Sequence, residues 1–198
     1  MKKILMTVFL SMVAIVPRSY SKIQNKMQDK SPWVYFDLGD TVISTKDFKH
    51  LHYFKGAREY MDELKRQGYK IGIITNIPET WGMDYDQKLQ TLKKFIHDGW
   101  DEDRPFDWSV YDEVILPLSN NEMKPALTLF LKAMNRAATC PSAYIGESPK
   151  EIVAAESVGM AVKLFVESDP ELYVPVEKMA TYLKSNYHRE YDRDCFLE

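Results

Sequence analysis

Apolar residues occur along this chain in short blocks whose spacing predicts strands and helices in alternation. Residues 33–36 (WVYF) form a continuous apolar run that ends at an acid, which is typical of a buried strand. Residues 56–67 place their apolar side chains at helical spacing and end at a glycine, which is typical of a helix. The same reading predicts strands at 33–36, 70–75, 113–116, 143–145 and 160–165, and helices at 56–67, 85–97, 125–138, 149–158 and 171–185.

Strands that alternate with helices through short links indicate a parallel α/β sheet. We therefore expect one domain over residues 33–185, a three-layer Rossmann-like fold with about five parallel strands and helices on both faces. The segment 42–53 and the link 117–123 are the places where a cap domain would be inserted, and both are too short to hold one. We expect an open site with only a small flap, Val42–Tyr53, which suits a bulky substrate or closure by a neighbouring subunit.

The N-terminal residues have the layout of a secretory signal peptide. Two lysines precede an uncharged apolar run at 4–16, and serines stand at positions 19 and 21. The run is shorter than the roughly 17 residues that a membrane span needs. We predict a signal peptide at 1–21, a flexible lead-in at 22–32 and a polar tail at 186–198. The protein is then exported, to a periplasm or the outside, without stable membrane insertion after cleavage; an uncleaved anchor or a buried N-terminal helix is the alternative.

Charge and cysteine content narrow the function further. The 198 residues carry 26 Lys and Arg against 29 Asp and Glu, a net charge of −3, and contain no basic block, which argues against nucleic-acid binding. Two cysteines, Cys140 and Cys195, exclude a disulfide-rich scaffold. Export permits a bond between them, and two unpaired thiols are the alternative.

Polar residues follow the predicted strands at the edge where parallel sheets carry their chemistry. Asp37 ends the first strand in the run FDLGDTV and suits a nucleophile or metal ligand, or else a turn. Thr75 and Asn76 end the second strand; a hydroxyl there suits a phosphate oxygen, although Thr is common in strands. Glu147 ends the fourth strand.

Lys124 and Glu151 each have two readings. Lys124 precedes Pro125 at a predicted helix start, where the helix dipole disfavours a cation unless a carboxylate or anion lies nearby; an exposed lysine is the alternative. Glu151 follows Ser148 by three residues, with Pro149 between them, which also fits a helix-capping box.

Taken in order, these residues resemble the motifs of the haloacid dehalogenase superfamily of hydrolases. FDLGDTV is similar to the first motif, IGIITN to the second, the KP at Lys124 to the third and IGESPKEIVAAESVGM to the fourth. The resemblance covers Trp33 to about Phe165, which is nearly the whole expected domain.

The resemblance implies a phosphatase that hydrolyses phosphomonoesters through an aspartyl-phosphate. Asp37 would attack the phosphoryl group, Thr75 would bind a phosphate oxygen and Lys124 would offset the negative charge. Asn76, Trp81 and Lys124 are the expected substrate contacts, with packing on the sheet as the alternative for Trp81. The implied Mg²⁺ ligands are Asp37, the main-chain carbonyl of Gly39, Glu147 and Glu151. The partner would be a phosphorylated small molecule or macromolecule.

The sequence departs from the family pattern at two positions. Gly39 stands where most phosphatases of the family carry an aspartate that acts as general acid, and Glu147 stands where aspartate is usual. Four nearby residues could replace the acid if the flap covers the site: Asp40, Asp47, His50 and His52. A catalytically degraded relative that binds a phosphorylated ligand or a protein partner, and a carbon–halogen hydrolase that needs no metal, are therefore the alternatives. We expect the aromatic and acidic segment 99–109 at the opposite edge of the sheet.

Overall fold

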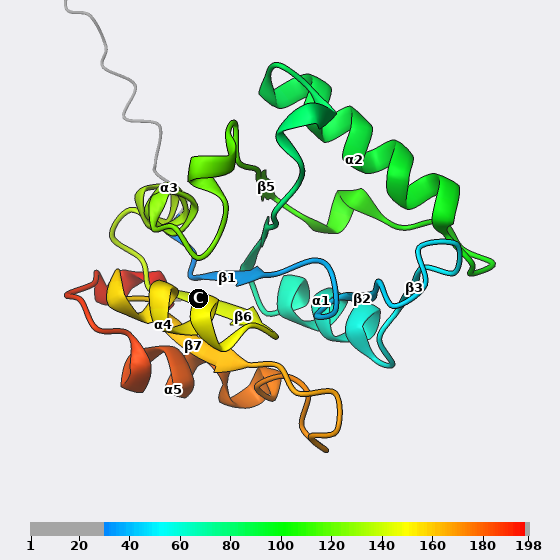
Figure 1. Cartoon of the computed structure of the whole chain (residues 1–198). Coiled ribbons are helices and arrows are strands. Elements are labelled where there is room, and N and C mark those ends of the chain that lie inside the picture. The colour runs from blue at the N-terminus through cyan, green and yellow to red at the C-terminus, as the bar shows by residue number, and fades with distance from the viewer. Residues whose placement is uncertain (1–29, 197–198) are drawn as a thin grey trace, which may run out of the picture.

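The computed structural model describes residues 30–196 (Figure 1). The expected signal peptide and most of the expected lead-in lie outside the described residues. Five parallel strands form the central sheet: β1 (Trp33–Phe36), β4 (Lys70–Ile74), β5 (Glu113–Ile115), β6 (Ser142–Gly146) and β7 (Ala161–Leu164). Their order is β5-β4-β1-β6-β7, so β1 lies in the middle, as Figure 1 shows. This confirms the predicted fold class.

Helices cover both faces of the sheet because the side chains of β1 alternate between two cores. Val34 and Phe36 pack with α1 (Ala57–Arg66), α2 (Tyr85–Gly99) and α5 (Val176–Asn186). Trp33 and Tyr35 pack on the other side with α3 (Thr128–Ala137) and α4 (Pro149–Ser157). Within residues 30–196, no helix combines the length and the apolar character needed to span a membrane.

Two helices begin later than predicted. The main-chain N–H of Ala126 bonds the carbonyl of Met123 in a turn, so α3 begins at Thr128 rather than at Pro125. The helix predicted from residue 171 begins at Val176, because Pro175 disfavours helical backbone in the residue before it. Lys124 therefore stands in a loop and not at a helix start.

The segment after β1 forms a flap that the sequence pattern suggested only in outline. It contains a two-stranded antiparallel hairpin, β2 (Ile43–Ser44) and β3 (His52–Tyr53). The prediction that segment 99–109 lies at the far edge is wrong for its first residues, because they hold the flap. The N–H of Leu51 bonds the carbonyl of Gly99 at 2.7 Å, and the N–H of Tyr53 bonds the side chain of Glu102 at 2.7 Å.

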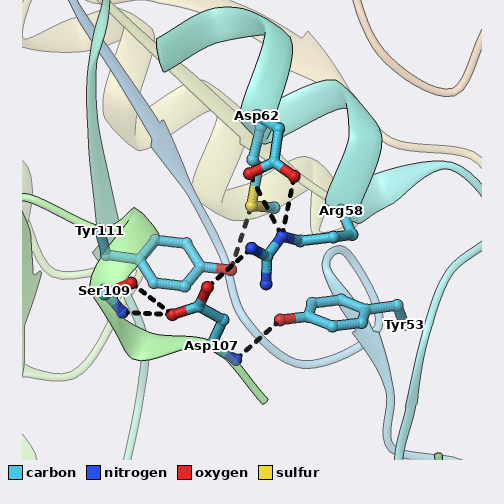
Figure 2. Close-up of polar contacts among 7 residues, drawn as sticks. Tyr53, Arg58, Asp62, Asp107, Ser109 and Tyr111 are labelled. Carbon is cyan, nitrogen blue, oxygen red and sulfur yellow. Dashed lines mark hydrogen bonds and ion pairs between the residues drawn. The ribbon is translucent and has the colours of Figure 1, made fainter. Parts of the chain in front are cut away.

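A cluster of polar side chains ties the flap and α1 to the turn before β5 (Figure 2). Arg58 bonds Asp62 at 3.1 Å through Nε and Asp107 at 2.7 Å through Nη2. The N–H of Ser109 donates to Asp107 at 2.8 Å, and the N–H of Asp107 donates to the Tyr53 hydroxyl at 3.2 Å. The flap is thus attached at two places to elements outside the sheet.

A disulfide between Cys140 and Cys195 attaches the tail to the loop before β6, with a Cα–Cα distance of 5.6 Å. The N–H of Asp192 also bonds the carbonyl of Thr139 at 2.9 Å, and that of His188 bonds the carbonyl of Gly159. The part of the polar tail that the structure describes, up to residue 196, therefore lies against the domain.

Candidate active site

The carboxyl ends of the central strands bring together residues that are far apart in the sequence. Asp37 and Glu147 directly follow β1 and β6, and these two strands are hydrogen-bonded neighbours. Lys124 comes from the loop after β5, and Glu151 comes from the first turn of α4. The arrangement follows from the topology, because parallel strands present their carboxyl ends at one edge.

Lys124 is the centre of this group. Its side chain is 1% exposed, and its ammonium lies 2.7 Å from Asp37 Oδ1 and 2.7 Å from Glu151 Oε2. It also donates to the hydroxyl of Tyr144 at 2.9 Å. The cation that the sequence left without a partner is therefore buried between two carboxylates, and the reading of an exposed lysine is wrong.

Asp37 is buried, and its environment acts on its protonation from several sides. Burial raises the pKa of Asp37 to about 7, the charge of Lys124 opposes the rise, and a hydrogen bond and the charge of Glu147 add to it. Oδ1 accepts from the N–H of Leu38 at 2.8 Å as well as from Lys124. One carboxylate oxygen is thus fixed by two donors, and the other oxygen faces no such N–H pair.

The charges around Asp37 suit a divalent cation. Asp37, Glu147 and Glu151 bring three carboxylates to a site in which Lys124 supplies one positive charge. The hydroxyl of Thr41 donates to Glu147 Oε2 at 3.1 Å and orients it. Among residues 30–196, no three His, Cys, Asp or Glu side chains are grouped as a metal site. Mg²⁺ commonly uses only one or two protein carboxylates, with water and substrate phosphate completing the shell. The close pair of Asp37 and Glu147 fits that requirement, and the Gly39 carbonyl remains the predicted third ligand.

Glu151 contacts Lys124, and its role as a metal ligand stays a prediction. Its Oε2 accepts from the Tyr144 hydroxyl at 2.6 Å in addition to the lysine contact. The capping-box interpretation of Glu151 is wrong, because the side chain of Ser148 forms no capping hydrogen bond at the start of α4.

The remaining predicted site residues, Thr75, Asn76 and Trp81, follow β4 and differ in their contacts. The side-chain amide of Asn76 accepts from the N–H of Lys124 at 2.7 Å and donates to its carbonyl at 3.0 Å, so it clamps the lysine's main chain. The hydroxyl of Thr75 forms no hydrogen bond with the part of the chain that is described, although Thr75 is buried. The Trp81 ring packs on Phe95 of α2, with centroids 5.2 Å apart, and its role as a substrate contact stays a prediction.

The four residues that could replace the missing general acid form hydrogen bonds with other flap residues or with Asp101. Asp40 accepts from the N–H of Thr45, and Asp47 from that of Lys49. His50 pairs with Asp101 at 2.8 Å, and His52 bonds the carbonyl of His50. Within residues 30–196, no hydrogen bond or ion pair joins these four to Lys124 or to the carboxylates around it.

Thr45 occupies the space beside Gly39. A Cβ placed on Gly39 would lie 3.3 Å from Thr45 Cγ2 and 3.4 Å from its Oγ1. The flap thus fills part of the volume that a longer side chain at position 39 would enter. Sequence reasoning found neither Thr45 nor Tyr144, because one is an ordinary flap residue and the other an ordinary aromatic residue in a buried strand.

Comparison with known proteins supports the fold. No protein-family model and no curated protein sequence matches the chain. A hydrolase from Streptococcus pneumoniae TIGR4 is similar in structure, with a TM-score of 0.50 and 13% identity over 78% of this chain and 99% of that chain. At this identity the similarity shows a shared α/β fold and no more.

Two further HAD-type structures are similar over most of their length. One is a HAD-superfamily hydrolase from Ehrlichia chaffeensis, with a TM-score of 0.49 and 14% identity over 80% of this chain and 97% of that chain. The other is a HAD-family enzyme from Bacteroides thetaiotaomicron in complex with magnesium and inorganic phosphate, with a TM-score of 0.49 and 10% identity over 71% and 97%. Residues 30–196 of the present chain contain no inserted cap domain.

Proposed function

We propose that this chain is an exported, magnesium-dependent phosphatase that hydrolyses phosphomonoesters through an aspartyl-phosphate. The observation that carries the proposal is the environment of Asp37. It stands at the end of the central strand, its Oδ1 is held by Lys124 and by the N–H of Leu38, and a second carboxylate, Glu147, lies beside it. A buried carboxylate with one fixed and one available oxygen suits nucleophilic attack.

The described residues divide the chemistry among them. Asp37 Oδ2 attacks phosphorus as the ester oxygen leaves, and water then attacks the aspartyl-phosphate and releases inorganic phosphate. Lys124 offsets the charge of the attacking carboxylate and opposes the rise of its pKa. The hydroxyl of Thr75, which no described residue engages, donates to a phosphoryl oxygen. Mg²⁺, held by Asp37, Glu147 and the Gly39 carbonyl, would shield the carboxylate from the negative charge of the phosphate.

The leaving group receives little help from this chain. Position 39 carries no acid, and the acids of the flap are engaged elsewhere. Because a general acid typically contributes about 10² to 10⁴ in rate, we expect a preference for phosphomonoesters whose leaving groups need no protonation.

Export is supported by the cysteines. Both cysteines of the chain form one disulfide, and such bonds persist in oxidising compartments and are rare in the cytosol. This agrees with the expected signal peptide. Cell fractionation with a tagged protein tests it: recovery of the full-length chain in the cytosol would contradict export.

The test of the function is hydrolysis of para-nitrophenyl phosphate with Mg²⁺ and with EDTA. Asp37→Asn removes the nucleophile, and Asp98→Asn, on the exposed surface of α2, is the matched control. We expect metal-dependent turnover that Asp37→Asn abolishes and Asp98→Asn retains. Mass spectrometry of the quenched protein should find the phosphoryl group on Asp37.

Two other outcomes separate the alternatives. Absence of turnover on this and other phosphomonoesters would favour the degraded relative that only binds a phosphorylated ligand, for which Gly39 is the supporting observation. Turnover of a halogenated acid that EDTA leaves unchanged would favour the carbon–halogen hydrolase. Either result would overturn the proposal.

A further inference from the structure

The hydroxyl of Tyr144 joins two charged residues of the site. It accepts a hydrogen bond from Lys124 at 2.9 Å and donates one to Glu151 Oε2 at 2.6 Å. We propose that Tyr144 is a positioning residue that holds Lys124 against Asp37, a role that rests on the proposed function. It touches neither the attacking oxygen nor the metal ligands, and it acts through the lysine.

Counting the donors of Lys124 shows why this contact matters. An ammonium has three N–H groups and no acceptor. Here they point to Asp37 Oδ1, Glu151 Oε2 and the Tyr144 hydroxyl, at 2.7, 2.7 and 2.9 Å. Every donor has one partner, so the ammonium has one favoured orientation. Removing the hydroxyl leaves one N–H without its acceptor and leaves Glu151 without its second donor.

Tyr144 is itself held rigidly. It is fully buried on β6, and its ring packs edge-on against Phe130 with centroids 5.0 Å apart. A Cβ on Gly146 would lie 2.9 Å from the Tyr144 hydroxyl. Only because position 146 is a glycine is there room for that hydroxyl. Burial, with the charges of Asp37 and Glu151, raises the pKa of Tyr144 well above its ordinary value, so the hydroxyl keeps its proton and remains a donor.

The contrast with Tyr35 separates positioning from general packing. Tyr35 lies directly beside Tyr144 in the sheet register and is also fully buried. Its hydroxyl donates to the carbonyl of Ala133 at 3.3 Å and to Glu113 Oε2 at 3.4 Å, and no hydrogen bond joins it to Lys124. Tyr35→Phe therefore removes a buried hydroxyl from the neighbouring strand without disturbing the lysine.

The kinetic experiment compares Tyr144→Phe with Tyr35→Phe in the full protein. We expect Tyr144→Phe to lower kcat for para-nitrophenyl phosphate by about tenfold to a hundredfold, which corresponds to a lost hydrogen bond to a charged group, with KM changed less than about twofold. Tyr35→Phe should retain kcat, and both variants should have similar melting temperatures. A Tyr144→Phe enzyme with unchanged kcat, or with losses equal to those of Tyr35→Phe, would overturn the role.

A second measurement needs no activity. In protein carrying isotope-labelled lysine, the buried ammonium of Lys124 should give a nitrogen–proton signal, assigned by its loss in Lys124→Met. We expect this signal to shift or broaden in Tyr144→Phe and in Glu151→Gln but to stay in place in Tyr35→Phe. An unchanged signal in Tyr144→Phe would overturn the positioning role. If the signal shifts in Tyr144→Phe but the wild-type protein shows no Mg²⁺-dependent turnover, the contact between Tyr144 and Lys124 is supported and the proposed function is refuted.

Discussion

Replacing Lys124 with methionine should leave two buried carboxylates facing each other. The oxygens of Asp37 and Glu151 each lie 2.7 Å from the same nitrogen, so they are at most about 5.4 Å apart. With an effective dielectric constant near 20, two like charges at that distance repel by about 3 kcal/mol, and in the variant no cation offsets this repulsion. That energy corresponds to a further rise of about 2 units in a carboxyl pKa.

The loss of stability should therefore depend on pH. The pKa of Asp37 is already raised to about 7, so the folded state binds a proton more readily than the unfolded state, and stability falls as pH rises toward that value. In Lys124→Met the pKa is higher still, and the fall continues further. Near pH 6 Asp37 is protonated in both proteins and their stabilities should be close; near pH 9 we expect the variant to be about 3 kcal/mol less stable.

Urea unfolding in EDTA at these two pH values measures the difference without metal. Lys132→Met, which removes a half-exposed lysine on α3, is the matched control and should show no such dependence. An equal loss at both pH values would mean that methionine disturbs packing and that the charge pair is irrelevant. No loss at either pH value would mean that Asp37 and Glu151 are not close in the folded protein, and the geometry described above would be refuted.

Three further perturbations test other parts of the molecule. Replacing Cys140 and Cys195 with serine opens a loop whose ends are 55 residues apart, which should lower the free energy of unfolding by about 4 kcal/mol in urea titrations; equal stability of oxidised and reduced wild type would contradict this. Gly39→Asp makes a tight contact with Thr45 Cγ2, so we expect the double variant with Thr45→Ser to exceed Gly39→Asp alone in kcat/KM on esters with poor leaving groups, and equal values would show that the contact does not matter. Hydrogen bonds from Ser109 hold the pKa of Asp107 below its usual range, although burial opposes them. The ionised carboxylate of Asp107 therefore stabilises the folded state above its ordinary pKa, and this stabilisation is lost as the pH falls through the lower pKa of the folded state. Asp107→Asn should therefore cost about 1 kcal/mol near neutral pH and progressively less as the pH falls below the ordinary pKa of aspartate, and a cost that stays constant with pH would refute this account.

Much of the sheet could be predicted because its strands are short, continuous apolar runs. Residues 33–36 are buried on both faces, so hydrophobicity alone marks them. The same runs place Asp37 and Glu147 at strand ends, and the parallel topology then brings them to one edge. The flap hairpin has strands of only two residues, and so short a segment shows no alternation.

The wrong predictions arise where a tertiary contact overrides a local sequence preference. Pro125 suits the first turn of a helix, yet the main chain turns there, and Asn76 fixes the loop instead. Glu151 matches a capping box by spacing, but its carboxylate turns to Lys124 and Tyr144. The sequence indicated that Lys124 needed an acidic partner; only the packing of α4 on β6 shows which acid it is.

The close fit between Tyr144 and Gly146 has an evolutionary consequence. Because a Cβ at position 146 would lie 2.9 Å from the tyrosine hydroxyl, a larger residue at 146 requires a change at Tyr144. Tyr35 and its register partner Gly72 are related in the same way, since a Cβ on Gly72 would lie 2.3 Å from the Tyr35 ring. In related chains, each pair should covary as one inherited unit, a large ring beside a glycine or two residues of intermediate size.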